Sequence, residues 1–223
     1  MKKLIIIFLS LCITLPLTAQ KSAFTLDDLY KIKNVYDLHF SPDGQSIVFY
    51  ASETDLENGK SSTEIYMMKT NGSKLRQMTT NDAADFHPRW SGDGTAIYFL
   101  STREDGVQLW RLPVHGGEAT KLTDFGLGIS DPIVAQKGKK LIFTAEVFPE
   151  CGADAACSEQ INEDIAGGPM NAHVTDQLFY RHWNIWKDGR RIHTLLYDLD
   201  NHEVVVLPPG DMDSPSIVTG GGI

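Results

Sequence analysis

Several features that would assign this protein to a common class are scarce in the sequence. Lysine and arginine form no long cluster and the formal net charge is -9, so the basic footprint of a nucleic-acid-binding protein is missing. The three cysteines and seven histidines show no regular metal-ligand spacing, and we expect neither a metal nor another cofactor. No Gly-x-Ser-x-Gly motif, which presents a nucleophilic serine on a strained turn, occurs; the string 128–132 lacks its final glycine. No catalytic residue is therefore assigned.

A long apolar run is also rare, and the one example lies at the N-terminus. Lys2 and Lys3 precede the nearly apolar stretch Leu4–Leu17, and Ala19 offers a small residue at a cleavage position. This pattern predicts a secretory signal peptide over residues 1–19. A membrane anchor is the alternative, but roughly 14 apolar residues are few for a bilayer span. A lipoprotein signal at Cys12 is disfavoured because no small residue precedes it. We expect an exported protein, periplasmic or secreted, that leaves the membrane after cleavage.

What the sequence does contain is a repeated turn between two strands. Tyr36, Leu38 and Phe40 alternate with polar residues, which predicts a strand with one buried face. Ser41-Pro42-Asp43-Gly44 then supplies the residues of a tight turn, and an apolar strand follows over 46–51. The same unit returns at 86–100, with Gly94 lying 50 positions after Gly44.

The spacing of later residues extends this repeat to whole four-stranded units. Four pairs are each 44 positions apart: Ile65 and Leu109, Tyr66 and Trp110, Gly72 and Gly116, and Thr79 and Thr123. A period near 44 with four strands per unit is typical of a β-propeller, an all-β fold in which each unit is one blade. A short helix beginning after Thr25 is predicted ahead of the first blade.

The repeat also predicts the domain organisation. Residues 20–223 form an incomplete N-terminal propeller domain, with blade one at about 35–79, blade two at about 85–123 and blade three at about 130–207. The third blade is interrupted by an excursion over 147–192, and a fourth blade begins at 213. Natural propellers have typically four to eight blades. We therefore expect this chain to be the front part of a longer protein, whose final blade count and oligomeric state the sequence leaves open.

Specific segments resemble a known family. The Phe40–Gly44 motif with its following strand resembles the propeller repeats of prolyl oligopeptidase family serine peptidases and of periplasmic TolB. The helical stretch 25–33 is similar to the one that precedes the first blade in the acylaminoacyl-peptidase and dipeptidyl-peptidase 5 branch. Glu146–Cys151 with Cys157, and Leu178–Trp183 followed by 186–189, resemble the third-blade insertion of bacterial dipeptidyl-peptidase 5.

The resemblance implies an activity that this stretch cannot perform alone. In that family the propeller caps an α/β-hydrolase domain with a Ser-Asp-His triad, and the matching part lies beyond Ile223. The leading hypothesis is the propeller portion of an exported serine exopeptidase that removes dipeptides from peptide N-termini, with peptides as substrates. The alternative is a non-catalytic, TolB-like periplasmic propeller that binds protein partners. Residue preference, and dipeptidyl versus acylaminoacyl or endopeptidase activity, are left open.

The excursion holds the residues that we single out for binding and for a covalent link. Cys151 and Cys157 favour a disulfide in an oxidising compartment, with free thiols or a metal site as alternatives. A carboxylate is needed to hold a substrate's free ammonium group, which makes three acids the low-ranking candidates for substrate binding. Arg181 and His182 join them on family resemblance. The candidate set is Glu150, Glu163, Asp164, Arg181 and His182. The alternative for each acid is that it is a solvated loop residue with no role in binding.

Overall fold

The computed structural model describes residues 23–104, 106–135, 137, 139–169, 181–182, 185–186, 188–207 and 210–214. The predicted signal peptide lies outside these residues. The chain divides into two units, 1–32 and 33–223. In the first, helix α2 (Leu26–Tyr30) begins at Thr25, whose side chain accepts a hydrogen bond from the backbone N–H of Asp28. Hydrogen bonds from Thr25 lower the pKa of Asp28 to about 2. Among the described residues, no helix is both long and apolar enough to cross a membrane.

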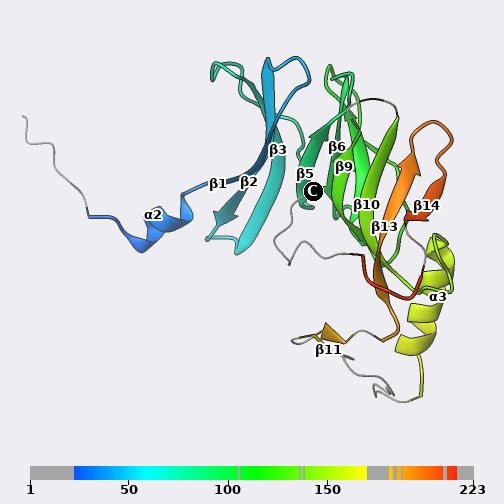
Figure 1. Ribbon diagram of the computed structural model, residues 1–223. Coiled ribbons are helices and arrows are strands. Elements are labelled where there is room, and N and C mark those ends of the chain that lie inside the picture. The colour runs from blue at the N-terminus through cyan, green and yellow to red at the C-terminus, as the bar shows by residue number, and fades with distance from the viewer. Residues whose placement is uncertain are drawn as a thin grey trace, which may run out of the picture. The chain divides into compact units, whose positions relative to one another are not determined.

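The second unit contains three four-stranded antiparallel sheets, seen side by side in Figure 1. The first sheet comprises β1 (Asn34–Phe40), β2 (Ser46–Asp55), β3 (Lys60–Lys69) and β4 (Arg76–Gln77). The second comprises β5 (Asp85–Trp90), β6 (Ala96–Ser101), β7 (Gln108–Pro113) and β8 (Thr120–Lys121). The third comprises β9 (Ile129–Val134), β10 (Lys140–Val147), β13 (Arg191–Asp198) and β14 (Val204–Leu207). The propeller class predicted from the repeat is confirmed, and we call the sheets blades one, two and three.

The turn motif has the same atomic structure in blades one and two. Gly44 and Gly94 both take positive φ, +68° and +71°, which a side-chain-bearing residue rarely adopts. One carboxylate oxygen of Asp93 accepts hydrogen bonds from Ser91 and from the backbone N–H of Thr95 at 3.0 Å, and Asp43 repeats this arrangement in blade one. The hydrogen bond from Ser91 lowers the pKa of Asp93 to about 2. The turn therefore fixes each strand pair with a charged aspartate.

Apolar side chains fill the space between successive blades. Val48 and Ile65 of blade one pack with Phe99 of blade two, and a second cluster joins Leu109 of blade two with Phe143 of blade three. All five side chains are fully or almost fully buried. Burial of such side chains contributes about 1.5–3 kcal/mol each, so these two layers dominate the stability of the described blades.

The predicted buried face of β1 is wrong. Tyr36, Leu38 and Phe40 are exposed, by 45%, 55% and 66%, whereas the intervening Asp37 and His39 are partly buried. A bulge between Tyr36 and His39, where Asp37 has φ +55°, interrupts the strand register. Asp37 bonds to His87 and Arg89 of blade two. Tyr36 stacks on Tyr50, whose ring meets Phe86 of blade two, whereas Leu38 and Phe40 are exposed. Period-2 alternation alone cannot tell which face meets a neighbour.

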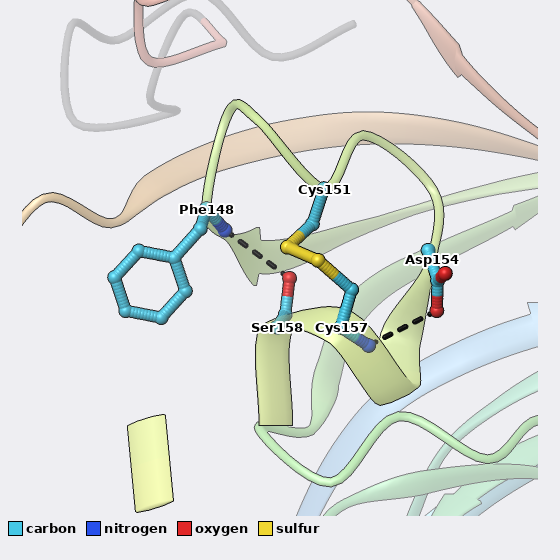
Figure 2. The surroundings of a disulfide bond; sticks show 5 residues. All are labelled: Phe148, Cys151, Asp154, Cys157 and Ser158. Atoms are coloured by element: carbon cyan, nitrogen blue, oxygen red, sulfur yellow. Dashed lines mark hydrogen bonds between the residues drawn. A yellow bond between two sulfur atoms is a disulfide. The ribbon is translucent and has the colours of Figure 1, made fainter. Parts of the chain in front are cut away.

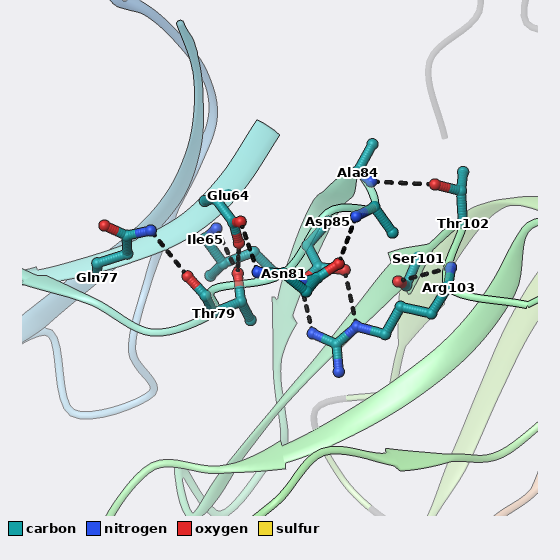
Figure 3. A network of polar contacts seen from close by, with 11 residues as sticks. Glu64, Ile65, Gln77, Thr79, Asn81, Ala84, Asp85, Ser101, Thr102 and Arg103 are labelled. Carbon is teal, nitrogen blue, oxygen red and sulfur yellow. Dashed lines mark hydrogen bonds and ion pairs between the residues drawn. The ribbon is translucent and has the colours of Figure 1, made fainter. Parts of the chain in front are cut away.

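A network of hydrogen bonds and an ion pair connects blade one to blade two at the link between β4 and β5, which we call a joint (Figure 3). Glu64, only 5% exposed, accepts hydrogen bonds from Thr79 and from the backbone N–H of Asn81, whose side chain donates to Asp85. Arg103 then pairs with the fully buried Asp85. Burial raises the pKa of Glu64 and outweighs these hydrogen bonds. The network satisfies the buried polar groups of the link between β4 and β5.

The following blades carry variants of this joint. Gln108 takes the place of Glu64 and binds Thr123, whose hydroxyl also accepts from the backbone N–H of Leu109. In blade three, Ser214 provides the hydroxyl, and His193 stands at the Glu64 position. His193 is 2% exposed, and neither ring nitrogen has a hydrogen-bond partner among the described residues. The equivalent position is thus occupied by a glutamate in blade one, a glutamine in blade two and a histidine in blade three.

A single carboxylate ties the first strands of the blades together. Asp37 Oδ2 lies 2.8 Å from His87 Nδ1 and 2.7 Å from Arg89 Nη1, and its Oδ1 lies 2.8 Å from His39 Nε2. Arg89 Nε donates to the carbonyl of Pro132 in blade three at 3.0 Å. Burial alone would raise the pKa of Asp37, but hydrogen bonds from the two histidines and Arg89 outweigh it and hold this pKa well below its usual range.

We predict that Asp37→Asn destabilises the propeller by about 2 kcal/mol at pH 7, because it removes the charge that Arg89 faces. A depressed folded-state pKa means that the carboxylate stabilises the fold above its unfolded pKa, about pH 4, and loses this effect as pH falls further. The difference in the free energy of unfolding between wild type and variant should therefore shrink below pH 4. Denaturant titrations at several pH values measure it, with Asp124→Asn, whose side chain is 89% exposed, as the control. Equal stability of wild type and Asp37→Asn at pH 7 would contradict the assignment.

Candidate functional site

Each blade has two rims with different contents. The Ser41–Gly44 and Ser91–Gly94 turns lie at one end of the strands, which we call the turn rim. The antiparallel order puts the β2–β3, β6–β7 and β10–β13 connections at the opposite end, the link rim. The excursion leaves β10 and returns to β13 and therefore projects from the link rim, where Figure 1 shows helix α3 (Ala155–Ala166) and β11 (Arg181–His182) below blade three.

The base of the excursion is a compact, cross-linked turn (Figure 2). A disulfide joins Cys151 to Cys157, with their Cα atoms 5.6 Å apart. Asp154 caps α3 by accepting a hydrogen bond from the backbone N–H of Cys157 at 3.0 Å. The buried hydroxyl of Ser158 accepts from the backbone N–H of Phe148 at 3.2 Å. The first turn of α3 is thereby tied by the disulfide to the turn that precedes it, and by one hydrogen bond to Phe148, the residue after β10.

Helix α3 was not foreseen from the sequence. Its signals are short: an N-cap aspartate, Asp154, followed by two alanines, and Gly167-Gly168 after the last turn. The helix has little amphipathic pattern, since only Ser158 is buried along its length. The excursion is therefore a structured element rather than a solvated loop over residues 147–169.

The three acidic candidates are exposed and lie at two places in the excursion. Glu163 and Asp164 lie near the C-terminal end of α3, and Asp164 accepts a hydrogen bond from Gln160 at 2.9 Å. Glu150 lies in the turn before the disulfide. Within the described part of the excursion, no hydrogen bond or ion pair joins Glu150 to either helical acid. Their role in binding stays a prediction.

The other two candidates lie in a small hairpin. Arg181 and His182 form β11, which pairs with β12 (Ile185–Trp186) in the register Arg181 to Trp186 and His182 to Ile185. The side chains of Arg181 and His182 lie outside the described residues, as do residues 170–180. The predicted contribution of this pair to substrate binding is therefore untested.

A pocket of about 350 Å³ opens where the excursion meets the link rim between blades two and three. Its walls include Val107, Ile129 and Ile192, and Glu146 is the one charged residue among the described residues that line it. Glu146 Oε2 accepts a hydrogen bond from Arg190 Nη1 at 2.8 Å, so the pair clamps the outgoing and returning arms of the excursion. Glu146 begins the segment that resembles the third-blade insertion, and no pattern in the sequence indicated this pocket.

Glycine makes one wall of this pocket possible. Gly106 has φ +68°, and a Cβ there would lie 3.0 Å from the carbonyl oxygen of Gly126. Across the same link, a Cβ on Gly126 would overlap the carboxylate of Glu159, which places α3 directly beside the pocket. The glycines at 106, 126 and 128 are the sequence signal that segments approach closely here, but the sequence does not show which segments they are.

Several polar groups of the described residues have partners within the fold. Among the described residues, no three histidine, cysteine, aspartate or glutamate side chains are placed to hold a metal ion. The charged groups at the first strands neutralise one another around Asp37, and the serines described above serve caps and joints.

A family model described as the TolB beta propeller domain matches residues 34–153, more than half of the sequence. The chain belongs to the TolB β-propeller family. This match covers blades one and two and the first half of blade three of the propeller, and it ends inside the disulfide-linked turn.

Known proteins similar to this TolB-type propeller include peptidases. Dipeptidyl-peptidase 5 of Porphyromonas endodontalis is 26% identical over 170 residues, which are 76% of this chain and 23% of that protein. The uncharacterized peptidase YuxL of Bacillus subtilis is 32% identical over 128 residues, 57% of this chain and 20% of that protein. The structure also resembles the acylaminoacyl peptidase of Pyrococcus horikoshii, with a TM-score of 0.59, 16% identity and coverage of 82% of this chain and 26% of that one.

These relatives confirm the resemblance to the propeller part of prolyl oligopeptidase family peptidases. The likeness to the Pyrococcus structure, at 16% identity, establishes the fold alone. The matched region of this chain spans 23% and 20% of the length of these two curated relatives.

We predict that loss of the disulfide loosens the excursion and leaves the blades intact. The closed loop is short, with a sequence separation of six, so its removal should cost roughly 2 kcal/mol locally by the loop-entropy model. In Cys151→Ser/Cys157→Ser, limited proteolysis should cut within residues 148–169 at least several-fold faster, while the blade core keeps its protection from hydrogen exchange. Ser158→Ala, which removes only the Phe148 hydrogen bond, serves as a milder comparison. Two reactive thiols at Cys151 and Cys157 on unreduced, exported protein would overturn the disulfide.

Proposed function

We propose that this TolB-type propeller is the N-terminal portion of an exported serine exopeptidase that removes dipeptides from peptide N-termini. The observation that carries the proposal is the disulfide-anchored excursion in blade three, because the blade repeat itself has no need of it. Its segments resemble the corresponding insertion of bacterial dipeptidyl-peptidase 5, and a protein of that name is similar over three quarters of this chain. The catalytic α/β-hydrolase domain would be encoded outside these 223 residues.

In this proposal the link rim faces the hydrolase domain. The propeller restricts access so that peptides reach the catalytic serine and folded proteins do not. The excursion projects from the same rim and contributes groups that recognise the substrate's N-terminal end. A carboxylate in a partly desolvated site would favour a free ammonium group over a blocked one, and Glu150, Glu163 and Asp164 are the candidates, with Arg181 and His182 as further contacts.

A second candidate function is a non-catalytic periplasmic propeller that binds protein partners. The observation in its favour is the family match itself, which is to the TolB propeller domain. The complete reading frame distinguishes the two. A Gly-x-Ser-x-Gly motif roughly 300 residues downstream supports the peptidase. A stop codon soon after the ring closes supports the binding module.

The peptidase proposal predicts a specific kinetic phenotype in the full-length protein. Chromogenic dipeptidyl substrates should be hydrolysed with a free N-terminus and poorly when N-acetylated, and a fluorophosphonate probe should label one serine. Replacing the anchoring acid among Glu150, Glu163 and Asp164 by its amide should raise KM about 10-fold or more for the free substrate and leave the acetylated one unchanged. Glu203→Gln, an acid of blade three outside the excursion, is the matched control.

Each result bears on a different part of the proposal. Absence of fluorophosphonate labelling and of peptidase activity in folded full-length protein would refute the peptidase. Activity without any selective KM effect in the three amide variants would retain the enzyme and remove the excursion acids from substrate binding. Export is tested by fractionation, with a mature N-terminus at Gln20 as the expected result.

A further inference from the structure

A second concave surface lies between blades one and two at the turn rim, away from the excursion. Its volume is about 480 Å³. Met67, Trp90 and Val114 contribute apolar walls, and Pro42 and Gly94 bring the turns of the two blades together beside it. An ideal Cβ on Gly94 would lie 3.6 Å from Pro42 Cδ, so the turns abut closely. We call this surface the turn-rim groove.

Three cations of blade one converge on the turn-rim groove: Lys69 at the end of β3, Lys74 in the β3–β4 turn and Arg76 in β4. Lys69 Nζ donates to Ser46 Oγ at 3.1 Å, and Arg76 Nη2 donates to the carbonyl of Val114 in blade two at 3.2 Å. Lys74 is exposed and makes no hydrogen bond or ion pair within the described residues. Arg76 is thus held in place across the interface while Lys74 keeps its donors for a ligand.

The blade architecture does not require these cations. In the strand register, Lys69 pairs with Ser46, and the matching pairs in the next blades are Pro113 with Ala96 and Asp198 with Lys140. The repeat of 44 positions puts Glu118 and Thr120 of blade two where Lys74 and Arg76 stand. All three equivalents in blade two are neutral or acidic. The chain as a whole is acidic, with a net charge of -9, so a cluster of three cations is unusual for it. The cluster is a feature of the interface between blades one and two and is not repeated at the equivalent positions of blade two.

Two acids also line the turn-rim groove, and their hydrogen bonds limit where an anion can sit. One oxygen of Asp43 accepts from Ser41 and Gln45, and Asp93 does the same with Ser91 and Thr95. These bonds lower the pKa of both carboxyl groups, which stay charged at neutral pH. An anion is therefore repelled from the turn side and attracted to the β3–β4 side.

The apolar wall of the turn-rim groove, which includes Trp90 and Met67, favours an organic ligand over a simple ion. The indole Nε1 of Trp90 donates to the carbonyl of His39 at 3.0 Å, which fixes the ring, and Met67 packs in the same apolar cluster. A volume near 480 Å³ is in the ordinary range for small-molecule sites, which pair apolar walls with a few placed polar groups. An inorganic anion would leave this wall unused.

We propose that the turn-rim groove binds a small organic carboxylate, whose charged group lies between Lys74 and Arg76 and whose apolar part lies against Trp90. Such a site is separate from the link rim and does not depend on peptidase activity. A guanidinium anchored to Val114 and an exposed ammonium together suit a carboxylate, and the apolar wall adds burial that a hydrophilic competitor would lack.

The proposal is tested by binding measurements on the full-length protein, with acetyl-Phe-Glu as the probe and its diamide as the uncharged partner. Isothermal titration and tryptophan fluorescence should show binding of the diacid at least 10-fold tighter than of the diamide. Affinity should fall several-fold between 50 and 500 mM salt, because the contacts are exposed charges. Trp90→Phe should remove most of the fluorescence change.

Variants separate the groove from general electrostatic attraction. Lys74→Asn keeps a residue that tolerates the positive φ of position 74 and should weaken the diacid about 5-fold or more. Lys139→Asn removes another exposed lysine, in blade three, and should leave affinity unchanged. Arg76→Gln also breaks the bond to Val114, so Lys74→Asn decides the case if Arg76→Gln fails to fold.

Three outcomes would overturn the proposal: equal binding of diacid and diamide, equal loss of affinity in Lys74→Asn and Lys139→Asn, or inorganic phosphate competing as strongly as the diacid at equal concentration. Because the assay measures binding alone, a protein without peptidase activity can still pass it, and an active peptidase can fail it.

Discussion

Face-to-face burial of apolar side chains between successive blades is the constraint on which the rest of the structure depends. Phe99 and Phe143 lie fully buried in the two layers, and each layer is built from residues of two neighbouring sheets. A blade alone would leave both of its faces in water, so each blade is stable only through its neighbours. Apolar packing alone would permit neighbouring blades to shift against each other. The polar contacts of Glu64, Gln108 and Asp37 fix the position of each blade relative to the next.

How far the sequence could predict this fold depends on the range of the interactions. The Ser41–Gly44 turn is specified within five residues, and its repetition in blade two made the propeller readable without a structure. The exposed face of β1 was predicted wrongly, because the bulge at Asp37 is stabilised by Arg89, which lies 52 positions away in sequence. Such a contact has no local signature.

The functional surfaces show the same limit. The cysteine pair indicated a cross-link, but the position of α3 depends on Ser158 meeting the end of β10 and on Glu159 lying over Gly126. The pocket beside Glu146 and the turn-rim groove each combine residues of two blades, and neither can be seen in a linear pattern. Comparison of equivalent positions in successive blades shows which residues the fold itself does not require. Lys74 and Arg76 differ in character from their equivalents in blade two, and His193 differs from Glu64 and Gln108. Such departures from a repeat indicate residues with a role of their own at that position.

We propose that the link rim, with its disulfide-anchored excursion, faces a catalytic hydrolase domain. Cross-linking mass spectrometry of the full-length protein measures this most directly, because α3 and the turn rim lie at opposite ends of blades one to three. Cross-links should join the helix acids Glu163 and Asp164 to the hydrolase domain, and none should join Lys74 to that domain. Cross-links from Lys74 to the hydrolase domain, with none from α3, would contradict it.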